Sequence, residues 1–289
     1  MKISGFTFVR NAIDLYYPIV ESITSILPIC DEFIVAAGDS TDGTTELIRS
    51  INDPKLTIIE TVWDKSLVSG ASNAQQTNIA LDACTGDWAF YLQADEVVHE
   101  DDLPVLVGYM QRYLDDRRVE GLLFDYLHFF ADYDHFQSAH GWYRREVRIV
   151  RTGIGVRSWR SAQGFRRNGK KLHVVPSGAR VFHYGWVRPP RHMMRKAHAF
   201  ETLHRGGQSA DARFPVNVDF DFGRLYGRAR FTRTHPAVMR DRIGARNWDV
   251  RPGISVHRHD KLGNRVLSFI ENRVLGFRLG EHRNYILLR

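Results

Sequence analysis

The 289-residue chain is 43% hydrophobic and 25% charged, which is typical of a folded globular protein and excludes a disordered or fibrous chain. The formal net charge is +7, yet residues 1–116 hold 19 acids against 6 bases, so the positive charge lies in residues 117–289. No apolar run is long enough to span a bilayer and residues 1–11 lack the pattern of a secretory signal, so we expect a cytoplasmic protein.

The first part of the chain alternates between two kinds of apolar pattern. Short runs rich in β-formers predict strands at residues 2–9, 32–37, 56–62 and 88–92. Apolar residues at helical spacing predict helices at residues 15–27, 44–51 and 71–84. This alternation predicts an α/β fold with a largely parallel sheet, whose ligands lie beyond the carboxyl ends of the strands.

The rest of the chain changes in character. A helix is predicted at 102–114 and strands at 121–130, 146–151 and 179–182, while residues 147–200 contain 13 Lys and Arg and no Asp or Glu. We predict one catalytic domain over residues 1–200, with a donor half at 1–116 and an acceptor half at 117–200. A basic helical extension at 201–289 is expected to pack on it.

Polar residues follow three of the predicted strands, as Arg10-Asn11, residues 39–42 and residues 93–96. With the segments Ile34–Thr44 and Asp87–Glu96, their order and spacing resemble the family 2 glycosyltransferases. The resemblance covers about the first 115 residues well and His183-Tyr184-Gly185-Trp186 more loosely. It implies a Rossmann-like GT-A fold, with a mixed, mostly parallel sheet that binds a nucleotide sugar.

The resemblance also implies a set of donor-binding residues. A carboxylate at Asp39 can accept hydrogen bonds from a ribose hydroxyl or a base N–H. Helix capping is the alternative, but a cap explains Thr41 or Asp42 and leaves Asp39 without a role. Arg10 and Asp64 have weaker support than the others. The full nucleotide set is Val9, Arg10, Asn11, Asp39, Ser40, Asp64, Asn73, Gln93 and Ala94.

A divalent cation, Mn²⁺ or Mg²⁺, is expected where the family places Asp-x-Asp, because it stabilises the charge of a departing diphosphate. Asp95 is the natural ligand, but Gln93 stands in place of the first Asp. His183 resembles a late metal-binding His, which would favour Mn²⁺. The alternative for His183 is a histidine in the core.

The general base is less obvious, because the family places an acid after the strand at 146–151 and this chain has none there. Glu146 is our candidate for the catalytic base. Its alternative role is an ion pair with a neighbouring arginine, Arg144, Arg145 or Arg148. Other groups that could replace it are Asp125, Asp132, Asp134, His128 and His140.

The basic half suggests an anionic partner. Arg166 and Arg167 are predicted to bind the acceptor or a phosphate, since arginine recognises phosphate and carboxylate well. Residues 262–278 could form a basic amphipathic helix on a membrane surface, or a helix packed on the core. No nucleic-acid-binding signature accompanies the charge, so no nucleic acid partner is expected.

Together these residues predict an inverting glycosyltransferase of surface polysaccharide synthesis, with peripheral contact to the inner membrane face. It would move a sugar from a UDP or GDP type donor to an anionic saccharide or lipid-linked acceptor. Two alternatives stay open. One is a non-catalytic module that binds nucleotide sugars, and the other is a nucleotidyltransferase, which normally needs a glycine-rich phosphate loop that this chain lacks.

Overall fold

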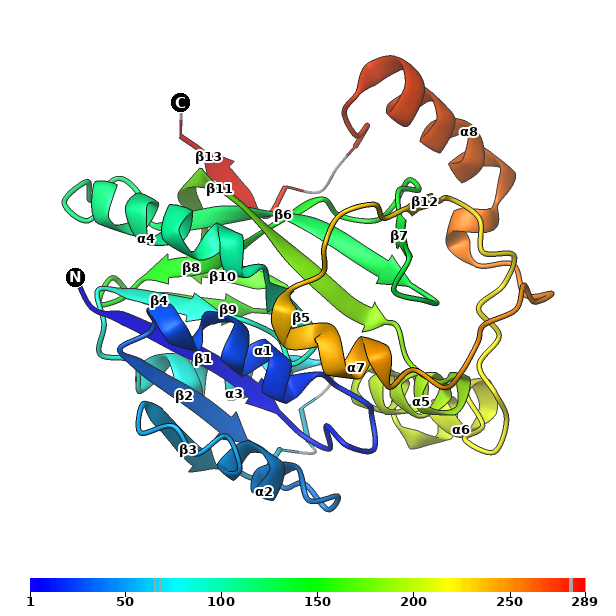
Figure 1. Cartoon of the computed structure of the whole chain (residues 1–289), viewed down its shortest axis with the longest axis horizontal. Coiled ribbons are helices and arrows are strands. Elements are labelled where there is room, and N and C mark those ends of the chain that lie inside the picture. The colour runs from blue at the N-terminus through cyan, green and yellow to red at the C-terminus, as the bar shows by residue number, and fades with distance from the viewer. Residues whose placement is uncertain (65, 68, 281–282, 289) are drawn as a thin grey trace.

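One large sheet organises the chain, as Figure 1 shows for the computed structural model. The structure describes residues 1–64, 66–67, 69–280 and 283–288. The strand order is β3-β2-β1-β4-β8-β6-β11-β10-β9. The donor half contributes β1 (Ile3–Val9), β2 (Glu32–Ala37), β3 (Leu56–Glu60) and β4 (Trp88–Tyr91), which pair in parallel.

The other half of the sheet is mixed. It is built from β6 (Gly121–Phe130), β8 (Arg145–Arg151) and β11 (Lys170–Trp186), with β8 antiparallel to both β4 and β6 and with β11 parallel to β6. The shorter strands are β5 (Glu96–Val98), β7 (His135–Gln137), β9 (Val156–Trp159), β10 (Gly164–Arg167), β12 (Arg228–Arg230) and β13 (Tyr285–Leu287). The predicted mixed, mostly parallel α/β sheet is therefore confirmed.

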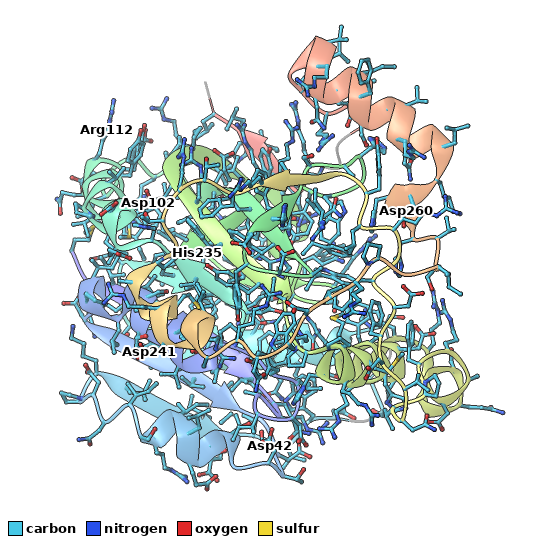
Figure 2. All side chains as sticks on the ribbon, turned by 45° about the vertical axis from the view of Figure 1, so that its right-hand side comes forward. Asp42, Asp102, Arg112, His235, Asp241 and Asp260 are labelled. Atoms are coloured by element: carbon cyan, nitrogen blue, oxygen red, sulfur yellow. The ribbon has the colours of Figure 1, made fainter. Side chains whose placement is uncertain are left out.

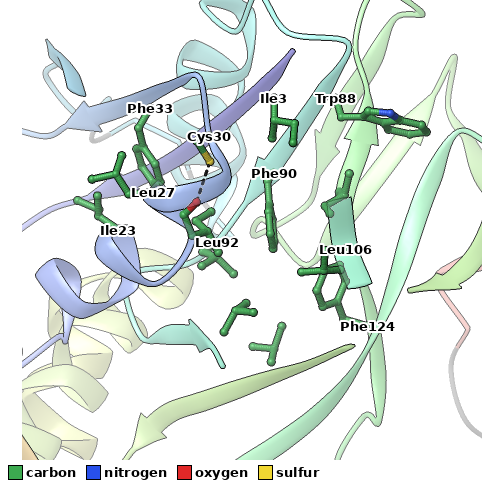
Figure 3. Packing of buried hydrophobic residues seen from close by; sticks show 14 of the residues in the cluster. Ile3, Ile23, Leu27, Cys30, Phe33, Trp88, Phe90, Leu92, Leu106 and Phe124 are labelled. Carbon is green, nitrogen blue, oxygen red and sulfur yellow. Dashed lines mark hydrogen bonds between the residues drawn. The ribbon is translucent and has the colours of Figure 1, made fainter. Parts of the chain in front are cut away.

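Helices cover both faces of this sheet. One core joins α1 (Ile19–Ile26) and α4 (Leu103–Arg112) to the strands, and Figure 3 shows its side chains. A second core lies under α3 (Ala71–Asp82). Asp42, before α2 (Thr44–Arg49), and Arg112, at the end of α4, lie at opposite edges of the view in Figure 2. None of the described helices is long and apolar enough to cross a membrane.

Several predicted boundaries were wrong. The first helix begins at Ile19 rather than residue 15, because Pro18 has no N–H and suits a helix start, and turns occupy residues 12–16. The strand predicted at 179–182 is part of the 17-residue β11. Its pairing with β6 is irregular between Pro176 and Arg180, where proline removes a donor from the ladder.

The C-terminal part of the chain begins inside a helix. The boundary predicted at residue 200 falls within α5 (Pro190–Arg205), which α6 (Gly207–Arg213) follows. Short strands then return to the sheet, since β12 pairs with β7 and β13 pairs with β11. The remaining helices are α7 (Arg240–Gly244) and α8 (Leu262–Ile270). The two-domain division stays a prediction.

Candidate active site

The loops after β1 and β2 meet at the carboxyl edge of the sheet. Asp39 Oδ1 lies 3.1 Å from Arg10 Nε and accepts a hydrogen bond of 3.2 Å from the Trp63 backbone N–H. The Arg10 guanidinium lies 5.6 Å from the centre of the Trp63 ring. Asp42, not Asp39, receives the Thr44 N–H at the start of α2. Helix capping therefore does not account for Asp39, which holds Arg10 in a half-buried crevice.

The neighbouring turn is fixed by two further bonds. The Asn11 N–H donates to Ser40 Oγ over 3.0 Å, and the Thr41 N–H donates to Asn11 Oδ1 over 3.1 Å. Gly38 is required here, because a Cβ at this position would lie 2.4 Å from Nε1 of Trp63. The structure thus brings Arg10, Asn11, Asp39 and Ser40 together as predicted.

The other predicted donor residues are more scattered. Asp64 accepts hydrogen bonds from Ser66 within its own turn, and Asn73 Nδ2 donates to Ser161 Oγ over 2.9 Å. Val9 is buried in the core, so only its backbone can face a ligand. Gln93 Nε2 donates to the Ala162 carbonyl over 3.2 Å, which ties the loop after β4 to the loop between β9 and β10.

Glu96 and Asp95 are adjacent but have different roles. Glu96 is fully buried, accepts two hydrogen bonds of 2.7 and 2.8 Å from Arg148, and accepts a third from Tyr126 Oη over 2.8 Å. These partners satisfy the carboxylate, as a buried charge requires. Glu96 therefore has a structural role, which leaves Asp95 as the other carboxylate of the pair.

Asp95 is surrounded by positive charge. Lys196 Nζ lies 2.8 Å from Asp95 Oδ2, and the guanidinium of Arg188 lies 3.7 Å from it. Burial opposes ionisation of Asp95, but the charges of Lys196 and Arg188 outweigh it and hold the pKa of Asp95 below its usual range. Asp95 is therefore a carboxylate at neutral pH.

Lys196 and Arg188 are residues that the sequence did not single out. The pKa of Lys196 is lowered to about 8, mainly by burial and secondly by the charge of Arg188. The charge of Asp95 acts in the opposite direction. Arg188 is fully buried and donates to the carbonyls of Leu15 and Gly185. Two buried cations thus share one carboxylate. This excess of positive charge suits an anionic ligand such as a diphosphate.

A histidine pair adjoins the same carboxylate. His128 Nδ1 lies 2.8 Å from His183 Nδ1, and His128 Nε2 lies 2.7 Å from the Tyr143 carbonyl. Burial lowers the pKa of His128 to about 3 and that of His183 to about 4, so both rings are neutral at pH 7. Because a carbonyl only accepts, we assign the His128 proton to Nε2 and the His183 proton to Nδ1.

This assignment leaves a bare lone pair on His183 Nε2, 3.7 Å from Asp95 Oδ1. A Cβ at Gly185 would lie 2.4 Å from that nitrogen and 3.1 Å from Asp95 Oδ2, so the glycine keeps this space open. An imidazole lone pair and a carboxylate oxygen that face each other suit a divalent cation. No set of three His, Cys, Asp or Glu ligands occurs among the described residues.

Glu146 occupies a buried site on β8. Its Oε2 atom has no hydrogen-bond partner in the described part of the chain. Of the arginines that might neutralise it, Arg145 binds Asp125 and Arg148 binds Glu96. Burial is the main cause that raises the pKa of Glu146 to about 7. The ion-pair alternative is therefore not what the structure shows.

The predicted acceptor arginines are engaged in structural contacts. Arg166 is buried and donates to the carbonyls of Phe165 and Asn284 over 2.8 and 3.1 Å. Arg167 donates to Glu120 Oε1 over 2.6 Å and to the Ile154 carbonyl over 3.0 Å. Both guanidinium groups hold β10 in place, and their role at an acceptor or a phosphate stays a prediction.

The sheet and the helices that cover it define an α/β protein. Residues 9–118 match the family model described as glycosyl transferase family 2. The match confirms the family resemblance over the donor half of the chain and agrees with the observed GT-A class of fold. A comparison with curated proteins finds no match.

Three solved structures align with this chain at low identity and with TM-scores below 0.5. Residues 1–349 of S. aureus TarS in complex with UDP-GlcNAc align at 19% identity over 45% of this chain and 35% of that chain, with a TM-score of 0.33. Without ligand, the same protein aligns at 12% over 73% and 68% of the two chains, with a TM-score of 0.38. The mannosyltransferase PcManGT from Pyrobaculum calidifontis, in complex with GDP-Man and Mn²⁺, aligns at 23% over 42% and 34%, with a TM-score of 0.32. The aligned segment thus spans about a third of the first and the last of these chains.

Proposed function

We propose that the protein is a glycosyltransferase that moves a sugar from a nucleoside diphosphate donor to a saccharide or lipid-linked acceptor. The observation that carries this proposal is the Asp95 centre, where the Lys196 ammonium, the Arg188 guanidinium and an unprotonated nitrogen of His183 all lie within 3.7 Å of one carboxylate. Asp95 falls within residues 9–118, which match a glycosyl transferase family, and Arg188 donates to the Leu15 carbonyl after β1.

The donor is proposed to lie along the carboxyl edge of the sheet. Asp39 would accept from the ribose or the base, with Arg10, Asn11 and Ser40 as the turn that shapes this crevice. The rest of the proposed nucleoside site is formed by Asp64, Asn73, Gln93 and Ala94. The ammonium of Lys196 and the guanidinium of Arg188 would then bind the diphosphate, because these two cations share a single carboxylate.

Asp95 and His183 are the residues that would hold a Mn²⁺ or Mg²⁺ ion. When bound, such an ion supplies Lewis-acid stabilisation of the negative charge on the departing diphosphate. His128 positions His183, because its Nδ1 accepts a hydrogen bond from His183 Nδ1–H and so fixes the tautomer that leaves Nε2 free.

Glu146 is proposed to accept the proton of the acceptor hydroxyl as the sugar is transferred with inversion. A general base works best when its pKa is near the working pH, and burial places the pKa of Glu146 at about 7. Its unpartnered Oε2 is free to receive that proton. Asn284 is a hydrogen-bond donor to the same carboxyl group and would orient it.

A part of the acceptor away from the reacting hydroxyl is proposed to bind in a cavity of about 240 Å³ beside His128, which Glu146 does not line. The ring of Trp142 can pack on a sugar, and Arg180 gives positive charge. Arg180 has no ion-pair partner among the described residues, while the nearby carboxylate of Asp125 binds Arg145. This volume is below the roughly 300–1,000 Å³ of drug-sized sites, so it suits about one sugar unit with an anionic group.

The proposal is tested by incubating the protein with a panel of UDP and GDP sugars and Mn²⁺. Slow release of the nucleoside diphosphate without acceptor, accelerated by a saccharide, is the expected result. Release of pyrophosphate would instead indicate a nucleotidyltransferase. Saturable binding without any product would indicate a non-catalytic module.

Substituting Asp39 by Ala should weaken donor binding by about 1–3 kcal/mol, because a buried hydrogen bond to the nucleoside is lost. Calorimetric titration with the preferred sugar nucleotide measures this change. Asp42→Ala is the matched control, since Asp42 bonds Thr44 at the start of α2 and should affect stability by about 1 kcal/mol instead. If Asp39→Ala and the parent bind the donor with equal affinity, Asp39 has only a structural role.

Adding a methyl group at Gly185 should impair the cation site without removing a ligand. The new Cβ would lie 2.4 Å from His183 Nε2, so the imidazole or the strand must shift. We expect Gly185→Ala to weaken Mn²⁺ binding by about tenfold or more. Gly108→Ala is the control, because nothing lies within 4 Å of a Cβ there. Unchanged Mn²⁺ affinity, measured by titration, would place the metal elsewhere.

A further inference from the structure

The segment formed by α8 and the π-helical turn Glu271–Leu275 carries its apolar side chains outward. Figure 1 shows α8 at the rim of the molecule, away from the central sheet. Four large apolar side chains of this segment and one that lies two residues after it are more than half exposed, and we call them the outer face: Leu262 (74%), Val266 (52%), Phe269 (63%), Val274 (70%) and Phe277 (56%). Such a concentration of exposed apolar surface is typical of an interaction site.

The contacts that attach the segment to the protein are polar. The His140 N–H donates to Ser268 Oγ over 2.8 Å, and the His140 ring bonds Glu271 Oε1 over 2.8 Å. Asn272 Nδ2 donates to the Ser138 carbonyl over 2.9 Å, and Arg278 pairs with Glu271. A helix on a globular protein normally buries its apolar side. This one buries its polar side, so the outer face has no cover in the described part of the chain.

The outer face forms one continuous stripe. Leu262, Val266 and Phe269 are spaced by four and three residues, which places them on the same side of an α-helix. A π-helical turn then follows, and its wider turn keeps Val274, five residues after Phe269, on nearly the same side. The stripe is therefore a flat apolar strip rather than a set of isolated side chains.

Charge on the segment has a single sign at the surface. Lys261, Arg265 and Arg273 are exposed. Glu271 is the one acid between residues 261 and 280, and it is fully buried against Arg278. An apolar strip that is flanked by exposed cations and lacks exposed carboxylates complements a surface with anionic headgroups above hydrocarbon.

We propose that the outer face binds the surface of an anionic lipid bilayer, with the apolar side chains in the headgroup and acyl boundary and the cations at the lipid phosphates. The helix packed on the core, which the sequence left as an alternative, is not observed. A second copy of the chain is the competing occupant, but pairing two such faces would bring their cations together, which disfavours it.

The same segment lies next to the proposed acceptor cavity. Loop 138–144, to which α8 is anchored, supplies Ser138, Trp142 and Tyr143 to the cavity beside His128. Membrane binding would therefore hold that cavity close to the lipid headgroups. This step rests on the proposed function, and it favours an acceptor carried on a lipid.

The test is co-sedimentation with vesicles of phosphatidylcholine, with and without phosphatidylglycerol. We expect binding to the vesicles that contain phosphatidylglycerol, weaker binding as salt is raised, and at least tenfold weaker binding for Phe269→Ser. Phe200→Ser is the matched control, because Phe200 is 54% exposed on α5, away from the outer face. Arg273→Gln tests the charge separately and should reduce binding to anionic vesicles.

Three outcomes would overturn the proposal. The first is no binding to anionic vesicles, and the second is equal binding by Phe269→Ser and Phe200→Ser. The third is a change of Phe269→Ser from dimer to monomer in sedimentation velocity, with vesicle binding unchanged, which would assign the outer face to a second copy. Hydrolysis of the sugar nucleotide is measured without vesicles in parallel. Hydrolysis without vesicle binding refutes the membrane proposal alone, and vesicle binding without hydrolysis refutes the proposed function alone.

Discussion

Asp95→Asn is expected to abolish sugar transfer while leaving metal-free binding of the nucleoside diphosphate in place. The asparagine cannot neutralise Lys196 and Arg188, so both buried cations remain for the diphosphate. It also removes the one anionic ligand of the proposed metal site, so Mn²⁺ should no longer strengthen nucleotide binding. Turnover, and nucleotide affinity with and without Mn²⁺, are the measurements.

The same substitution should destabilise the free protein. Removing one partner of a buried charge cluster leaves uncompensated charge, which costs about 3–5 kcal/mol. The nucleoside diphosphate should recover part of this stability, because its phosphates replace the lost carboxylate. Asp82→Asn, an exposed change on α3 that breaks a pair with Arg157, is the control and should alter neither property. If Mn²⁺ still strengthens nucleotide binding to Asp95→Asn, then Asp95 does not hold the metal.

The donor half was predictable because its information is local. Strands β1 to β4 each appear as one apolar run, and the polar residues that follow them meet where parallel strands end. Asp39 and Arg10 are 29 positions apart, yet their contact follows from the pairing of β1 with β2. The sequence motif and the sheet order therefore lead to the same crevice.

The cationic side of the centre was not predictable in this way. Lys196 reaches Asp95 from α5, 101 positions later, and nothing in the basic stretch distinguishes it or Arg188 from the arginines that serve the fold. Arg166 and Arg167 have the same residue type and the same acid-free surroundings, yet they bind carbonyls and Glu120. Only the packing of α5 against the end of β11 separates the two groups.

The different roles of the adjacent acids Asp95 and Glu96 also could not be predicted from the sequence. Glu96 follows Asp95 directly, and both suit a metal by residue type. The difference lies in Arg148 on β8, which reaches Glu96 with two hydrogen bonds and leaves Asp95 to Lys196. The partner of each carboxylate is set by contacts that are distant in sequence. Arg148, which binds Glu96, lies more than 50 positions away, and a local sequence pattern does not contain that contact.

Glu146→Gln is expected to lose most of the transfer activity while keeping donor affinity. If Glu146 takes the proton of the acceptor hydroxyl, its loss should reduce kcat by about 100-fold to 10,000-fold, which is the usual contribution of a general base. In the parent, kcat should rise with pH through about 7, where Glu146 loses its proton, and the variant should lack this step. Arg145→Gln is a useful comparison on the same strand, because Arg145 pairs with Asp125 rather than with Glu146.

Glu146→Gln should increase the stability of the folded protein above neutral pH, although it lowers the activity. Burial raises the pKa of Glu146 from 4.5 to about 7, so between these values the folded protein holds a proton that the unfolded chain has released. Stability in the parent therefore falls as pH rises from about 4.5 to 7, by about 3 kcal/mol for a shift of this size. Glu146→Gln has no charge to bury, so it should be more stable than the parent at pH 8 and nearly equal to it at pH 4.5. Urea denaturation at the two pH values measures the difference. If the variant is less stable than the parent at pH 8, Glu146 is ionised and paired in the folded protein. That outcome would exclude Glu146 as the base.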